Sequence, residues 1–351
     1  MRRLKYSEAI NDAIDTAMAK DPKIICYGLG VDDPKRIFGT TNQLMEKFGA
    51  QRVFDTPTSE NAMTGIGVGV AIAGFRPIMV HQRLDFFLLA MDQLVNSAAK
   101  WHYMFGGQMT VPLVIRLIIG RGWGQGPTHS QNLQSWFTHI PGLKVVSPTT
   151  AYDAKGLLLD SIFDENPVVF LEHRWLHNSE NDVPYGDYRI SIGTANVIRK
   201  GSDVTIVGMS YMTVEAIRAA DFLSSYGISC EVIDLRTIRP IDWISIFQSV
   251  SKTRKLIALD CSMPTCSIAS EIIARTSMEL FNELTHAPMR IANPDNPEPT
   301  SYGLTKNYHP TAINIVDAVA CMLGIAVKTD RLSEKHIHHH DIPGEWFQGP
   351  F

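Results

Sequence analysis

Arg76-Pro-Ile-Met-Val-His81 and Pro112-Leu-Val-Ile-Arg-Leu117 are two short, mainly apolar runs that decide the fold. Between them, residues 85–105 carry apolar side chains at helical spacing, which predicts one long helix. A strand, a helix and a second strand of this kind usually form a parallel pair with the helix on one face. The pattern therefore predicts a doubly wound α/β domain.

The same alternation extends in both directions along the chain. The first helix is predicted to begin near Ser7, which is a plausible N-cap residue. The other predicted elements of a first domain, residues 1–190, are strands at 23–27, 143–147 and 167–172, a helix at 60–73 and a helix after Thr150.

A polar stretch at residues 174–199 reads as a connection without packed elements, which places a boundary near residue 190. The pattern then restarts and predicts a smaller α/β domain over residues 191–328. Its predicted strands are 203–209, 229–235, 255–260 and 288–292. Four helices are predicted: one that ends near residue 225, one that starts at Asp242, one that follows Cys266 and one that spans residues 312–323.

Composition excludes several classes of protein. The net charge of −4 comes from mixed signs, without the basic stripe that nucleic-acid binding needs. No apolar run is long enough to span a bilayer, and the start lacks a signal-peptide pattern. The five cysteines are scattered, which favours reduced thiols. We expect a soluble, cytoplasmic protein that binds neither nucleic acid nor membrane.

The tail, residues 329–351, contains Lys335-His-Ile-His-His-His-Asp341. Clustered histidines can bind metal, but without a fixed partner spacing a solvated tail or a subunit contact is the better interpretation. The last nine residues include Trp346, Phe347 and Phe351, and we expect these rings to dock on a neighbouring subunit.

The segment Arg52-Val-Phe-Asp-Thr-Pro-Thr-Ser-Glu60 is the most informative for chemistry. Thr58 or Ser59 can cap the helix that follows, and Glu60 lies in its first turn, where the helix dipole favours a negative charge. Taken alone, helix capping explains the segment as well as catalysis does.

This segment belongs to a series of stretches, all in the same order, that resemble the β subunits of pyruvate, branched-chain and acetoin dehydrogenase E1 components within the transketolase-like thiamine-diphosphate superfamily. The resemblance implies a pyrimidine-binding doubly wound domain followed by a smaller transketolase C-terminal-like domain. The stretches are 52–60, 92–100, 129–131, 141–148, 166–172, 201–205 and 231–237.

The resemblance implies roles for residues near the cofactor. Glu60 corresponds to the glutamate that hydrogen-bonds to N1′ of the aminopyrimidine ring and thereby promotes loss of the C2 proton, which is acid–base work that an amide cannot do. Phe86 corresponds to the ring stacked on that pyrimidine, although plain core packing is its alternative. Thr58 and Gln82 are expected to contact the cofactor.

His129 begins the family's His-Ser-Gln motif and follows the glycine-rich stretch 120–126. The resemblance makes His129 an active-site histidine that exchanges protons near the substrate. The glycines match neither a dinucleotide fingerprint nor a P-loop, so we interpret them as a mobile wall of the site.

The superfamily's Gly-Asp-Gly motif, which holds the diphosphate through Mg²⁺, has no counterpart except Gly186-Asp187-Tyr188. The resemblance therefore implies a separate α-type subunit that carries Mg²⁺, an α2β2 assembly and a chain that is inactive alone. It further implies a potassium site built from five backbone carbonyls, those of Leu113, Ser161, Ile162, Asp164 and Asn166.

Two stretches depart from the family pattern. Val80-His-Gln-Arg-Leu-Asp85 places His81 and Arg83 near the predicted substrate pocket, and Gly28-Leu-Gly-Val31 lacks the usual acid. Arg83 could bind a substrate carboxylate or phosphate, or it could contact the α subunit.

Three hypotheses follow for the function. The first is an E1 component that decarboxylates a 2-oxoacid such as pyruvate and transfers the acyl unit to a lipoyl group on an E2 protein. The second is a split transketolase-like carboligase that uses an aldehyde acceptor. The third, a non-catalytic regulatory subunit, is disfavoured because Glu60, Phe86 and His129 are all present.

Overall fold

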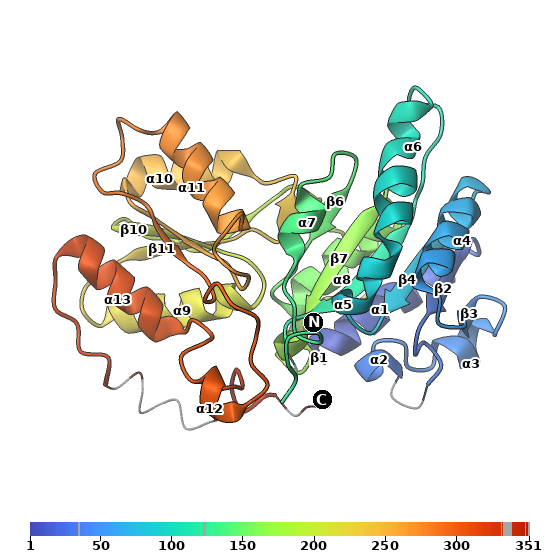
Figure 1. Ribbon diagram of the computed structural model, residues 1–351, viewed down its shortest axis with the longest axis horizontal. Coiled ribbons are helices and arrows are strands. Elements are labelled where there is room, and N and C mark those ends of the chain that lie inside the picture. The colour runs from blue at the N-terminus through green and yellow to red at the C-terminus, as the bar shows by residue number, and fades with distance from the viewer. Residues whose placement is uncertain (34–35, 122–123, 331, 333–338, 348, 350–351) are drawn as a thin grey trace. The chain divides into compact units, whose positions relative to one another are not determined.

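The computed structural model describes residues 1–33, 36–121, 124–330, 332, 339–347 and 349. These residues divide into two compact units, drawn in Figure 1. The first contains Met1–Gly120 and Trp136–Ile192, and the second contains Arg121–Ser135 and Gly193–Gly349. Residues 121–135, which the sequence pattern places in the first domain, therefore pack with the second unit.

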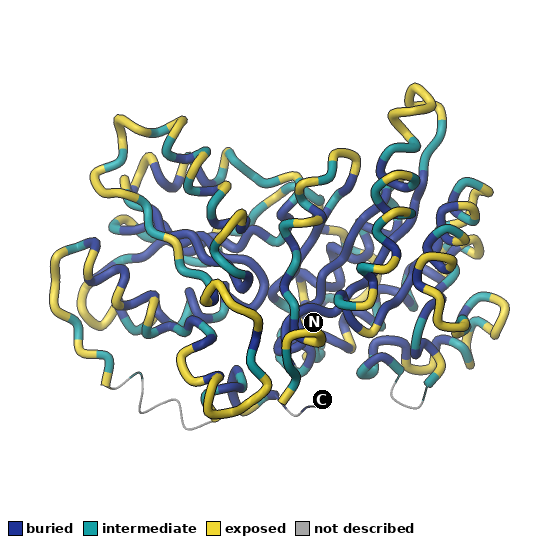
Figure 2. The backbone as a smooth tube through the Cα atoms, in the orientation of Figure 1, coloured by how far each residue is buried: buried dark blue, intermediate teal, exposed yellow. Residues whose placement is uncertain are grey.

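The first unit is built on a parallel sheet, as predicted (Figure 1). Strands β5 (Val114–Ile119) and β7 (Val168–His173) are buried along their whole length, as parallel strands between two helical layers are (burial in Figure 2). Its neighbouring strands are, in order, β6 (Lys144–Val146), β7 (Val168–His173), β5 (Val114–Ile119), β4 (Arg76–His81), β2 (Ile24–Gly28) and β3 (Val53–Asp55).

The helices of this unit agree with the sequence pattern except at two points. α1 (Tyr6–Lys20) packs on α8 (Ala151–Ile162); α8 follows Thr150 as predicted, and the Thr150 side chain caps it. α4 (Glu60–Ile72) packs on the segment that follows β4. That segment is helical but not one α-helix: it comprises α5 (Leu84–Phe87), the 3₁₀ turn η1 (Leu88–Ala90), the π turn η2 (Gln93–Ala98) and α6 (Ala99–Met104).

The second point is the start of α1, where the prediction of Ser7 as N-cap is wrong. Ser7 lies inside the helix and is buried. The backbone N–H groups of Tyr6 and Ser7 donate to the carbonyls of Ser179 and His177 at 2.9 and 3.1 Å, and the Lys5 N–H donates to the Glu8 carboxylate at 2.8 Å. These acceptors, and not the Ser7 hydroxyl, satisfy the start of the helix.

The prediction that residues 174–199 contain no packed element is also wrong. They include the 3₁₀ turn η3 (Arg174–Leu176), β8 (Glu180–Val183), which pairs antiparallel with β1 (Arg2–Lys5), and β9 (Asn196–Arg199). The partner of β8 is the N-terminal strand, about 180 residues earlier in the chain, and local periodicity cannot reveal a pairing over that separation.

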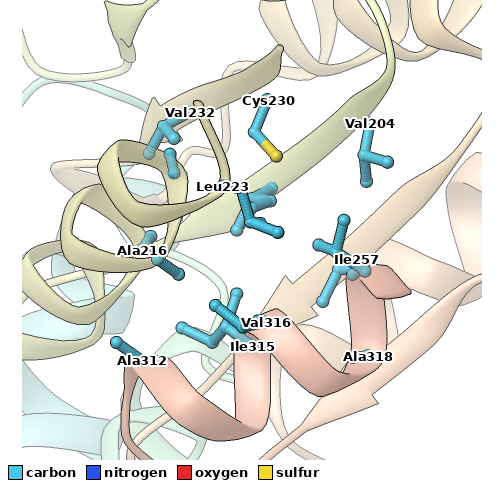
Figure 3. Close-up of a cluster of buried hydrophobic side chains, with 14 of the residues drawn as sticks. Val204, Ala216, Leu223, Cys230, Val232, Ile257, Ala312, Ile315, Val316 and Ala318 are labelled. Carbon is cyan, nitrogen blue, oxygen red and sulfur yellow. The ribbon is translucent and has the colours of Figure 1, made fainter. Parts of the chain in front are cut away.

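The second unit has a mixed sheet in the order β14 (Met289–Ile291), β13 (Leu256–Leu259), β10 (Val204–Gly208), β11 (Cys230–Asp234) and β9, with only β9 antiparallel. α9 (Tyr211–Ser224) and α13 (Ala312–Leu323) enclose the apolar cluster shown in Figure 3, where Leu223, Val316 and Ile257 lie together. The second unit also contains α10 (Trp243–Thr253), α11 (Ile268–Glu279), α12 (Tyr302–Thr305) and β12 (Thr237–Arg239). The short helices α2 (Arg36–Gly39) and α3 (Leu44–Phe48) belong to the first unit, and α7 (Gln134–Thr138) begins at the end of the segment 121–135.

Among the described residues, every helix is too short or too polar to cross a lipid bilayer.

Candidate functional site

Glu60 is the first residue of α4, five positions after β3 ends. Its side chain is buried (7% exposed), whereas Thr58 and Ser59 are exposed. Ser59 occupies the N-cap position but makes no side-chain capping bond. Since the hydroxyl does not cap the helix, capping does not explain this segment, and the buried carboxyl of Glu60 is its distinctive feature.

The first turn of α4 is held in place by contacts from the sheet. The Tyr27 hydroxyl on β2 donates to the carbonyl of Met63 at 2.9 Å, and burial raises the pKa of this phenol well above its usual range, so it remains a donor. Thr64 Oγ1 donates to the Glu60 carbonyl at 2.8 Å. A Cβ at Gly67 would lie 2.2 Å from the Tyr27 hydroxyl, so the contact requires glycine there. Glu60 thus starts from a fixed backbone.

The carboxyl ends of β2 and β4 approach each other closely. The Leu29 N–H donates to the Val80 carbonyl at 3.0 Å, and a Cβ at Gly28 would lie 2.1 Å from that oxygen. At Gly30 an added Cβ would meet Gln82 Nε2 at 2.7 Å. The departure from the family pattern at residues 28–31 is therefore a tight turn against Gln82, whose side chain is exposed.

Phe86 and Phe87 differ in burial, which bears on whether this aromatic pair packs in the core or stacks on a cofactor. Phe87 is fully buried and packs edge-on against His81, with ring centroids 5.0 Å apart. Phe86 is 40% exposed. Core packing is the role of Phe87, whereas Phe86 is partly exposed to solvent.

His81 and Arg83 lie at the carboxyl end of β4. His81 is 1% exposed, and in the described part of the chain neither ring nitrogen has a hydrogen-bond partner. Burial lowers the pKa of His81 to about 4, so the ring is neutral at pH 7. Arg83 is also buried and donates from Nη1 to the Gly120 carbonyl at 3.1 Å. Burial, with the Arg83 charge second, lowers the pKa of Arg174 to about 10, so two guanidinium groups share this edge of the sheet.

A buried ion pair joins β5 to β7 behind this edge, and sequence reasoning missed it. Arg116 Nε and Nη2 donate to the two carboxylate oxygens of Glu172 at 2.6 and 3.0 Å, and His177 Nε2 lies 3.3 Å from Glu172 Oε2. Burial alone would raise the pKa of Glu172, but Arg116 and His177 outweigh it and lower this pKa. The sequence did contain a signal for this pair, because Arg116 and Glu172 each interrupt an otherwise apolar predicted strand with a charge, and the two charges are opposite.

His129 belongs to the second unit, on the segment 121–135. Its ring is exposed, and Nδ1 lies 3.1 Å from Thr128 Oγ1. The segment is fixed further along, where Gln134 Nε2 donates to Asp260 Oδ1 at 2.6 Å and the Cys261 thiol donates to Asn132 Oδ1 at 3.6 Å. Asp260 and Cys261 directly follow β13. Their contacts with the segment were not predicted, because residues more than 100 positions apart share no local sequence pattern.

Four of the five carbonyls expected to bind potassium already accept hydrogen bonds, those of Leu113, Ser161, Ile162 and Asp164. Arg76 Nη1 donates to the carbonyls of Ile162 and Asp164 at 3.4 and 2.9 Å, and the Val168 N–H donates to that of Leu113. The Ser161 carbonyl accepts from the backbone of Asp164. The Arg76 guanidinium thus brings a positive charge to this site, so the fit to a potassium ion is partial. Across the described ranges, no cluster of three His, Cys, Asp or Glu side chains is arranged to hold a metal ion.

Comparisons with known proteins agree with this architecture. Residues 2–179 match the transketolase pyrimidine-binding domain, and residues 193–315 match the transketolase C-terminal domain. One chain of a split-gene transketolase, solved as an inactive β4 tetramer, superposes with a TM-score of 0.74 at 22% identity, covering 92% of this chain and 99% of that one. The fold is therefore that of the transketolase-like proteins.

Closer relatives narrow the class. The acetoin:2,6-dichlorophenolindophenol oxidoreductase β subunit of Cupriavidus necator is 42% identical over 90% of this chain and 96% of its own length. The pyruvate dehydrogenase E1 β subunit of Rhizobium meliloti is 40% identical over 91% of this chain and 70% of its own. This chain belongs to the E1 β-subunit family of thiamine-diphosphate-dependent 2-oxoacid dehydrogenases.

Proposed function

We propose that this chain is the β-type half of an E1 enzyme in which Glu60 activates thiamine diphosphate for decarboxylation of a 2-oxoacid such as pyruvate, with a lipoyl group on an E2 protein as acyl acceptor. The observation that carries the proposal is the buried carboxyl of Glu60 on a helix turn fixed by Tyr27 and Thr64. Catalytic acid–base groups need such a fixed position and restricted access of water.

Bound thiamine diphosphate would supply the nucleophilic carbon that attacks the oxoacid and takes up the electrons left when CO₂ departs. Glu60 would hold a proton shared with ring nitrogen N1′ of the aminopyrimidine. Phe86, which is 40% exposed, would stack on that ring, and Thr58 and Gln82 would make polar contacts beside it. His129, exposed on its loop, would move protons at the substrate carbonyl and the acceptor.

A partner subunit of the α type would complete the enzyme. The relatives are named as β subunits, and the sequence offers no Gly-Asp-Gly motif for a magnesium diphosphate. Mg²⁺ would therefore be held by the α chain, in an α2β2 assembly. A potassium ion at the carbonyls around Asp164 would have to share them with Arg76.

Arg83 and His81 would act at the substrate end of the site. Arg83 brings a positive charge to the carboxyl edge of β4, and a guanidinium is the group best suited to hold a carboxylate. His81 would support Phe87 and thus the helix that carries Phe86, as a neutral ring.

The test is coexpression with the α-type subunit, followed by CO₂ release from a panel of 2-oxoacids with an artificial electron acceptor, a lipoylated protein or an aldehyde as the second substrate. We expect release only with both chains present, and acyl transfer to the lipoyl group. Turnover by this chain alone would contradict the shared site, and transfer to the aldehyde alone would indicate the carboligase.

A further inference from the structure

The C-terminal tail beyond residue 328 lies outside both matched domains, and its described part, residues 339–347 and 349, is not a free end. Asp341 and Phe347 are buried. The Trp346 ring lies under the Arg218 guanidinium at 4.8 Å, and Arg218 Nη2 also donates to the Pro343 carbonyl at 3.2 Å. The tail therefore packs on the second unit of its own chain. Docking of its end on a neighbouring subunit stays a prediction, and residues 333–338 and 351 lie outside the described part.

The tail begins this packing at α12. The ring of His340 lies 4.0 Å from that of Tyr302, and its Nε2 is 2.7 Å from the Tyr302 carbonyl and 3.1 Å from Thr305 Oγ1. His339 Nδ1 lies 3.3 Å from the Tyr302 hydroxyl. The two described histidines of the cluster thus hold the tail against the protein.

Asp341 connects the tail to Arg121, at the start of the segment that contains His129. Its carboxylate lies 3.7 Å from Arg121 Nη2, and the side chains are 2% and 0% exposed. The Arg121 Nε also lies 3.2 Å from Glu298 Oε1. A carboxylate out of water is costly unless a cation faces it, so the buried position of Asp341 depends on Arg121.

Arg121 is the first residue of the segment that carries His129. The middle of that segment rests on the loop next to Glu298, because a Cβ at Gly126 would lie 2.0 Å from Thr300 Oγ1. Its far end is fixed by the Gln134 to Asp260 hydrogen bond. In the described part of the segment, Gly124 and Gly126 carry no side chain that could hold the loop, so its course is set by these attachments.

We propose that the C-terminal tail positions the His129 segment, with Asp341 and Arg121 as positioning residues. The tail pins the near end of the segment, while Asp260 pins the far end, and His129 stands exposed between the two. The inference rests on the proposed role of His129, but the attachment itself is measurable without activity.

The first measurement is hydrogen–deuterium exchange of the full chain, read on peptides from residues 124–135. Asp341→Asn removes the charge that meets Arg121, and Trp346→Ala releases the tail at Arg218, away from Arg121. We expect both variants to speed exchange in these peptides by about tenfold, since local opening follows the loss of its buried contacts. Asp330→Asn, an exposed acid of the same tail, should leave exchange unchanged.

The second measurement is turnover of the assembled enzyme. Asp341→Asn should lower kcat and leave KM for the oxoacid unchanged, and Asp341→Glu should restore part of kcat. Unchanged exchange in Trp346→Ala, or equal acceleration in Asp330→Asn, would overturn the role of the tail. A wild-type complex that releases no CO₂ from any oxoacid would instead overturn the proposed function, whatever the exchange result.

Discussion

The helix turn that carries Glu60 and the loop that carries His129 are held in place by different physical means. The Glu60 turn is fixed by uncharged groups that are near in sequence, such as the Tyr27 hydroxyl, 36 residues from its acceptor. The His129 segment is fixed by charged and amide groups that are distant, such as Gln134 and Asp260, 126 residues apart. The contact of Tyr27 with the Glu60 turn forms when the sheet of the first unit forms. The contact of Gln134 with Asp260 requires the second unit to be folded.

This difference suits the work proposed for each residue. A group that shares a proton with a ring nitrogen must keep one position through every turnover, and close packing around glycine provides that rigidity. A histidine that serves both the substrate and an incoming acceptor can use a loop that rests on a few polar contacts. The predictions below break one anchor at a time.

The largest effect is expected for Glu60→Gln compared with His129→Gln in the assembled enzyme. An amide cannot exchange the proton, so Glu60→Gln should slow C2 proton exchange of the cofactor by about 100-fold or more. His129→Gln should leave C2 exchange unchanged and lower only the steady-state rate. Exchange measured by NMR separates the two, and normal exchange in Glu60→Gln would reject its assigned role.

Gly67→Ala tests how rigid the Glu60 anchor is. The new methyl group would lie 2.2 Å from the Tyr27 hydroxyl, so we expect the free energy of unfolding to fall by about 1–3 kcal/mol. Gly69→Ala is the matched control on the same helix, since its Cβ would meet nothing within 4 Å and should stabilise the chain by up to about 1 kcal/mol. Urea unfolding measures both, and equal values would show that α4 shifts freely.

His81→Leu tests whether burial of a neutral ring against Phe87 makes the first unit sensitive to acid. The folded pKa of His81 is about 4, below the unfolded value near 6.5, so unfolding takes up a proton between these values. Stability is full above pH 6.5 and falls as the pH drops towards 4, by roughly 2 kcal/mol at pH 5 for this residue.

The leucine variant should lose that part of the acid sensitivity, whereas the exposed His102→Leu should keep it. His177, whose pKa burial also lowers to about 4, supplies a similar slope in every variant. Identical pH profiles of wild type and His81→Leu, followed by thermal unfolding, would contradict the burial argument.

Gln134→Ala gives the smallest effect and probes the other anchor. Asp260 keeps its bonds from Ser262 and Ile268 but loses one donor, which we expect to cost about 1 kcal/mol. Proteolysis within residues 124–135 should become faster, and Gln108→Ala, at an exposed site, should change neither quantity. Slower cleavage in Gln134→Ala would show that the hydrogen bond does not restrain the loop.

The sequence by itself determined the elements that depend on local pattern. β4 and α13 have the predicted bounds, Thr150 and Asp242 are the N-caps of their helices, and the transketolase-like class follows from segments in a fixed order. These features depend on side-chain periodicity and on residues three apart, which a single chain displays without folding.

Only the tertiary structure decided which distant groups meet. It paired β8 with β1, placed Ser7 inside a helix, joined Arg116 to Glu172 and attached the His129 segment to Asp260 and Asp341. Such contacts have no sequence period, because each is chosen by the cost of leaving a polar group without a partner once the chain has brought it out of water.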